Sequence, residues 1–88
     1  MIIIKGDRSY YQLNKIVGAY IAESGDAYRT KLYDLHIYFG LSAEDIFLAR
    51  FKLETKALKA HAYLETLLAY GFDEELEEKI IDIRDVGN

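Results

Sequence analysis

The apolar positions of the chain recur mainly at spacings of three and four, which predicts amphipathic helices. The first such stretch runs from about residue 7 to Ser24, and Ser9 followed by Gln12 spells a capping box near its start. Its apolar stripe consists of Leu13, Ile16, Val17, Tyr20 and Ile21. A second helix is predicted over residues 27–39, with an apolar face made of Tyr28, Leu32, Leu35 and Phe39. Each stretch ends at a glycine, Gly25 or Gly40, where a helix commonly needs a left-handed residue.

The longest predicted element is a helix over about residues 42–70, because this stretch contains neither proline nor glycine. Its apolar seam alternates steps of four and three, the spacing of packed helices. The seam consists of Ile46, Arg50, Leu53, Ala57, Ala60, Leu64, Leu67 and Gly71. Such a helix would be roughly 40 Å long, whereas a compact domain of this size is roughly 25–30 Å across. The pattern therefore predicts a central helix that extends beyond a small body.

The C-terminal segment is compatible with two structures. Leu76, Ile80 and Ile83 share one helical face behind Asp73, which predicts a fourth helix. The β-branched residues of "IIDIRDV", residues 80–86, could instead form a strand that pairs with the N-terminal "MIIIK". We expect a single all-α domain over residues 1–88, with three to four helices and a long central helix. The alternative is that the two ends of the chain form a short two-stranded β pairing in place of the fourth helix.

The composition narrows the classes of function. Half of the 88 residues are apolar (51%), which is enough for a core, and cysteine is absent. The absence of cysteine excludes disulfides, thiolate nucleophiles and cysteine-based metal sites. The N-terminal apolar run has four residues, too short for a signal peptide, and no stretch approaches the ~20 apolar residues that span a bilayer. We therefore expect a cytoplasmic protein with no membrane partner.

The formal charge of −4 is unevenly distributed. In residues 73–88, seven acidic residues against Lys79 and Arg84 give a net charge of −5. In residues 50–72, four basic residues against two acidic ones give +2. This distribution favours self-association or a basic protein partner over nucleic acid.

Candidate catalytic and metal-binding residues are few. His61 and Glu65 are four residues apart and could face one ion, but two ligands without a third make a weak site. The serines lie at predicted helix ends, and no glycine-rich phosphate-binding motif is present. We expect no enzymatic activity, no cofactor and no bound metal.

The stretch "YFGLSAEDI", residues 38–46, resembles the turn of helix-turn-helix DNA-binding proteins. A DNA-binding regulator that uses residues 38–52 is therefore the alternative function. In that fold the start of the second helix enters the major groove, so Glu44 and Asp45 would face a phosphate-lined surface. The nearest cations on that helix, Arg50 and Lys52, lie about two turns away. We favour a plain corner between two packed helices.

A long helix that is apolar on two sides would expose more hydrophobic surface than a soluble monomer tolerates. We therefore expect a homo-oligomer, with a dimer favoured, in which the long helices of two chains pack together. The residues predicted for this contact are Leu53, Ala57, Ala60, Leu64 and Leu67.

The chain also has eight tyrosines, a residue type that concentrates at interfaces. Those predicted to contact an unidentified protein partner are Tyr10, Tyr11, Tyr33, Tyr38 and Tyr63. The predicted function is that of a small non-enzymatic interaction module: an adaptor, regulator or inhibitor.

Overall fold

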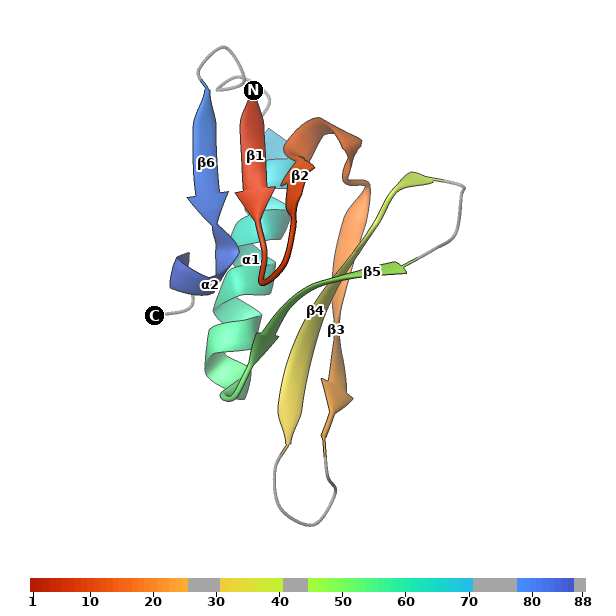
Figure 1. The fold of residues 1–88 in the computed structure, drawn as a ribbon, viewed down its shortest axis with the longest axis vertical. Coiled ribbons are helices and arrows are strands. Elements are labelled where there is room, and N and C mark those ends of the chain that lie inside the picture. The colour runs from red at the N-terminus through yellow and green to blue at the C-terminus, as the bar shows by residue number, and fades with distance from the viewer. Residues whose placement is uncertain (26–30, 41–44, 71–77, 87–88) are drawn as a thin grey trace.

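The computed structural model describes residues 1–25, 31–40, 45–70 and 78–86, and in them two small sheets share a core with one long helix (Figure 1). The elements in chain order are β1 (Ile2–Lys5), β2 (Tyr10–Gln12), the 3₁₀ helix η1 (Leu13–Lys15), β3 (Gly18–Ser24), β4 (Leu32–Tyr38), β5 (Asp45–Phe51), α1 (Glu54–Tyr70), β6 (Lys79–Asp82) and α2 (Ile83–Val86). The fold is therefore mixed α/β.

The first sheet joins the two ends of the described chain, in the order β2-β1-β6. Strands β1 and β2 form an antiparallel hairpin, and Lys5 lies opposite Tyr10. Strands β1 and β6 are parallel, with Ile3 beside Ile80 and Lys5 beside Asp82. Figure 1 looks onto one face of this sheet, with α1 behind it.

The second sheet is an antiparallel meander in the order β3-β4-β5. A register shift between Leu35 and His36 marks an irregularity in the pairing of β4 with β5. The turn between β1 and β2 docks on β5, because the Asp7 amide donates to the Leu48 carbonyl at 2.8 Å. A side chain at Gly6 would collide with that same carbonyl group, so the close approach of the two backbones requires glycine.

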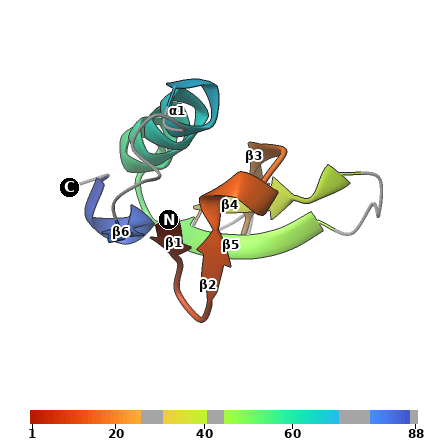
Figure 2. The same cartoon turned by 90° about the horizontal axis from the view of Figure 1, so that it is seen from above.

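Helix α1 lies on one side of both sheets and covers the core (Figure 2). Its buried face packs on the meander and on α2. The residues of that face are Ala57, Ala60, Leu64 and Leu67. Isoleucines from both ends of the described chain complete the same core: Ile2, Ile4, Ile81 and Ile83. No helix in the described part of the chain combines the length and the apolar character needed to cross a bilayer.

The prediction of an all-α fold is wrong. Residues 10–12, 18–24, 32–38 and 45–51 are strands, although the sequence predicts helices there. In β4 the side chains alternate, so that Leu35 and Ile37 enter the core while His36 faces the other way. These stretches are apolar on both faces and rich in β-branched and aromatic residues, so helical spacings can be found in them. Pairing with strands distant in sequence decides the outcome.

The predicted central helix over residues 42–70 is also wrong in its N-terminal part, before Glu54. Residues 45–51 form β5, and the helix covers only residues 54–70. Its 17 residues span about 25 Å, so α1 does not extend beyond the body as a free rod. Residues 41–44, including the predicted cap Ser42, lie outside the described residues.

The terminal strand pairing, the alternative at the chain ends, is confirmed by the parallel pairing of β1 with β6. Strand β6 spans residues 79–82, and the chain then forms the single turn α2. The predicted start of a fourth helix at Asp73 lies outside the described residues. Gly25 and Gly40 have positive φ angles of 97° and 50°, as expected of left-handed residues, but they follow strands instead of helices.

Candidate interaction surface

The first sheet has one face in the core and one face turned away from it, which we name the outer face. Because side chains alternate along a strand, Ile2, Ile4 and Ile81 are buried while their neighbours point outward. The outer face consists of Met1, Ile3, Lys5, Tyr10, Gln12, Glu78, Ile80 and Asp82. No described element lies in front of it (Figures 1 and 2).

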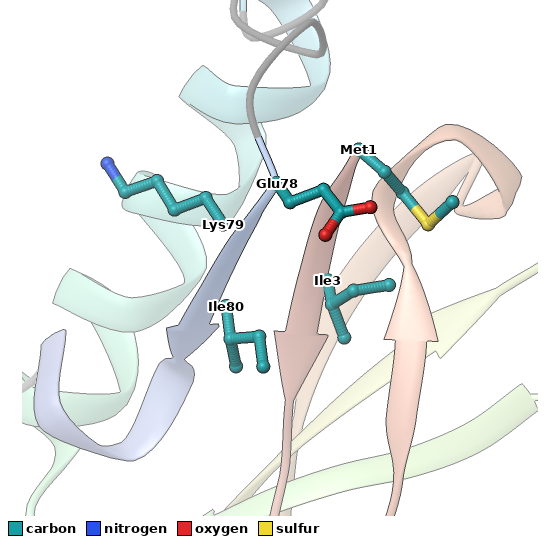
Figure 3. Close-up of a pocket in the computed structure, with 5 residues that line it drawn as sticks. All are labelled: Met1, Ile3, Glu78, Lys79 and Ile80. Carbon is teal, nitrogen blue, oxygen red and sulfur yellow. The ribbon is translucent and has the colours of Figure 1, made fainter.

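One half of the outer face is apolar and hollowed. A hollow of about 350 Å³ is lined by Met1, Ile3, Glu78, Lys79 and Ile80. In Figure 3 the Glu78 carboxylate reaches toward Met1, above the two isoleucines. Ile80 is 64% exposed and Met1 is 45% exposed. Exposure of apolar side chains beside one another is unusual for a surface that contacts only water.

The other half of the outer face is charged. The Lys5 ammonium lies 3.9 Å from a carboxylate oxygen of Asp82 and 5.8 Å from the centre of the Tyr10 ring. Asp82 is held more tightly by Arg84, whose Nε and Nη2 donate to its two oxygens at 2.9 and 2.7 Å. The Arg84 guanidinium thereby holds the pKa of Asp82 below its usual value, and Asp82 raises the pKa of Arg84.

The charges continue from the first sheet to the second. Arg84 lies 3.9 Å from Asp7, and Asp7 accepts a hydrogen bond of 3.0 Å from the backbone N–H of Arg50. The Arg50 guanidinium in turn donates to both oxygens of Asp34 at 2.8 and 3.2 Å. Hydrogen bonding to Arg50 lowers the pKa of Asp34, although burial opposes this. This charge network joins β6 and α2 to the meander.

A second candidate surface lies on the meander. The rings of Tyr20 and His36 stack with centroids 5.1 Å apart, and Phe47 meets His36 edge-on at 6.0 Å. A smaller hollow beside them is lined by Arg8, Phe47 and Arg50. The rings contact one another, and the Arg50 guanidinium is held by Asp34. The buried Nδ1 of His36 has no hydrogen-bond partner among the described residues, but the rings and the Arg50 guanidinium are otherwise held by contacts within the chain, so this surface is the weaker candidate.

Four of the five residues predicted for a helix–helix dimer are buried in the core of a single chain. Ala57, Ala60 and Leu64 are 0% exposed and Leu67 is 9% exposed. Leu53 precedes α1 and is 55% exposed. Because the strands of the same chain cover α1, the apolar seam no longer gives a reason for association through these residues.

The structure separates the five predicted interface tyrosines. Tyr10 is 60% exposed and lies on the outer face. Tyr11 points to the other side of β2 and packs on Phe39, with ring centroids 5.8 Å apart. Tyr33 packs against the core, the Tyr38 ring covers Gly18, and Tyr63 is 37% exposed on α1. Only Tyr10 joins the candidate surface.

The predicted site residues did not include Ile3, Lys5 and Ile80. The alternation of "MIIIK" as a strand would have placed Ile3 and Lys5 together.

The predicted corner between two packed helices is wrong, because the elements that flank residues 41–44 are the strands β4 and β5. The alternative helix-turn-helix would need the same two helices. Ser42, Ala43 and Glu44 lie outside the described residues, and Asp45 accepts a hydrogen bond of 2.7 Å from the Tyr20 hydroxyl.

His61 lies 3.1 Å from the Ala19 carbonyl oxygen and 3.5 Å from a carboxylate oxygen of Glu65. Within the described ranges, no three or more His, Asp or Glu side chains are grouped closely enough to hold a metal ion.

Comparison with known proteins adds no relative: no protein-family model, no curated protein and no solved structure matches the chain significantly. The geometry of the surface is therefore the basis of the functional argument.

Proposed function

We propose that this chain is a small non-enzymatic protein-interaction module that binds its partner through the outer face of the β2-β1-β6 sheet. The observation that carries the proposal is the apolar half of that face, where Ile80 and Met1 remain largely exposed beside Ile3. Contiguous apolar surface rimmed by polar groups is typical of protein contacts. Tyr10, whose ring is amphipathic, lies on the same face.

The position of β6 supports the same proposal. In the order β2-β1-β6 this strand is at the edge of the sheet. The Lys79 amide donates to the Met1 carbonyl at 3.0 Å, so in a parallel ladder the backbone groups of Ile80 point away from β1. Edge strands with an exposed apolar residue are common sites of partner binding. We also propose a cytoplasmic location, supported by the absence of cysteine.

Site-specific photo-crosslinking in the native host tests this function. A photoreactive phenylalanine replaces Ile80, and in a matched control it replaces Leu58, an apolar residue of α1 that is 51% exposed. We expect position 80 to yield a discrete crosslinked species, either with another protein or with a copy of this chain. Adding Ile3→Asp should remove that species, because it places a charge in the apolar half. Equal yields at positions 80 and 58 would contradict the proposal.

A further inference from the structure

The outer face carries the acidic Glu78 and the basic Lys5 at opposite ends. Two copies of this face in opposite orientations therefore bring a negative charge near a positive one. Glu78 lies at one end of the face, and Lys5 lies at the other end beside Asp82. Ile3 and Ile80 lie side by side between these ends. Glu78 directly precedes β6 and Asp82 ends it, so the two residues are four positions apart, a separation of about 13 Å at the rise of a β-strand. Figure 3 shows the Glu78 carboxylate directed toward β1, the strand that carries Lys5.

A two-fold axis that lies parallel to the sheet and perpendicular to its strands reverses these ends. Two copies related by such an axis meet face to face, and each β1 lies over the β1 of its partner in the opposite direction. The isoleucines then meet isoleucines at the centre. Each β6 likewise lies over the β6 of its partner, so Glu78 faces the partner's Asp82, whose charge is balanced by Arg84, and lies diagonally from the partner's Lys5. Met1, which extends toward β2 in Figure 3, would approach the exposed Tyr10 ring of the partner.

We infer that the partner of the outer face is a second copy of this chain, held in this antiparallel two-fold arrangement by two Glu78–Lys5 pairs. The inference rests on the proposed function, because it identifies the occupant of the same surface. Lys5 is suited to the role: its own contact with Asp82 is long, at 3.9 Å, and Asp82 already accepts three hydrogen bonds from Arg84. The Lys5 ammonium can therefore turn to Glu78 of the other copy without leaving Asp82 unpaired.

The size of the face sets the strength of the contact. The sheet has three strands of three or four residues each. The area that one face of such a sheet can bury is smaller than the ~800 Å² per partner of a standard stable interface. The dimer is therefore weak and in equilibrium with monomer. Its electrostatic part weakens with added salt, because exposed ion pairs are screened.

Sedimentation equilibrium of the purified full chain at low ionic strength, up to a concentration on the order of 1 mM, tests this inference. We expect a monomer–dimer equilibrium. Glu78→Lys and Lys5→Glu should each weaken it about tenfold, because each variant turns two attractive contacts into repulsive ones. Mixing the two variants in equal amounts should restore dimerisation, because both contacts between unlike copies are again attractive. Intramolecular effects cannot produce this rescue.

The matched control is Lys59→Glu, which changes the charge as Lys5→Glu does but lies on the exposed side of α1. This variant should dimerise like the original chain and should not rescue Glu78→Lys on mixing. Circular dichroism of every variant checks that the fold is retained. A chain that is monomeric throughout, or a failure of the mixed variants to associate, would overturn the inference.

The two proposals fail in different ways. If position 80 crosslinks to a different protein while the purified chain stays monomeric, the interaction surface stands and the second copy is overturned. If position 80 crosslinks no better than position 58, the surface itself is overturned.

Discussion

Asp34 is the only charged side chain that is buried among the described residues, at 6% exposure. A carboxylate in this position is costly unless hydrogen bonds replace its water, and both of its oxygens accept from Arg50. The sequence could not predict this pair, because the two residues lie on different strands. It becomes visible only once β4 is paired with β5, which places Asp34 opposite Arg50. The pair therefore belongs to the fold and explains why Arg50 is not a free cation for a ligand.

The lowered pKa values of Asp34 and Asp82 predict a loss of stability in acid. Each carboxyl takes up a proton more readily in the unfolded chain than in the folded one. Their contribution is therefore present above the unfolded-state pKa of about 4 and is lost as the pH falls through the lowered folded-state values. We expect the free energy of unfolding, measured in urea, to decrease from about pH 5 to pH 3.

The variant Asp34→Asn isolates this effect. It should be about 1 kcal/mol less stable at pH 7, a modest value because Arg50 is half exposed, and it should lose less stability on acidification. Glu23→Gln, at an exposed position of β3, is the control and should follow the original chain. Parallel pH profiles for Asp34→Asn and the original chain would contradict this assignment.

Among the elements, the sequence predicts only some segments reliably. Residues 54–70 are helical as expected, because their apolar positions keep one helical stripe and their polar positions contain good helix formers. The pairing of the chain ends could be recognised from two short β-branched runs. The meander could not be recognised, because strands that are apolar on both faces show no clean alternation. The candidate surface was missed for a related reason: as a helix, residues 80–83 place Ile80 and Ile83 on one buried side, whereas as a strand they expose Ile80.

The role of α1 in the core yields a prediction for Leu64. Leu64→Ala removes a fully buried side chain and should destabilise the protein by about 2–5 kcal/mol. Leu58→Ala, on the exposed side of the same helix, should change stability by less than about 0.5 kcal/mol. Urea unfolding at two protein concentrations a hundredfold apart measures both. The loss at Leu64 should be independent of concentration, because its neighbours belong to the same chain. A loss that grows on dilution would instead place Leu64 in a contact between chains.

At the scale of the whole molecule, the two sheets are joined in two ways. The shared core links Ile4 and Ile81 of the first sheet to Leu35 and Ile37 of the second. The charge network from Asp82 through Arg84, Asp7 and Arg50 links them at the surface. This arrangement holds the first sheet with one face in the core and leaves its outer face uncovered by any described element (Figure 1). The supported sheet thereby presents a surface with Ile3 and Ile80 at its centre, Glu78 at one end, and Lys5 beside Asp82 at the other.

A dilution series of the assigned ¹H–¹⁵N correlation spectrum tests self-association through the outer face most directly, because it locates the contact residue by residue. We expect the amide signals of Ile3, Lys5, Tyr10 and Ile80 to move with concentration, while those of Leu58 and Lys59 on α1 stay in place. Concentration-dependent shifts centred on the exposed side of α1, or an outer face whose signals do not move, would contradict self-association through the outer face.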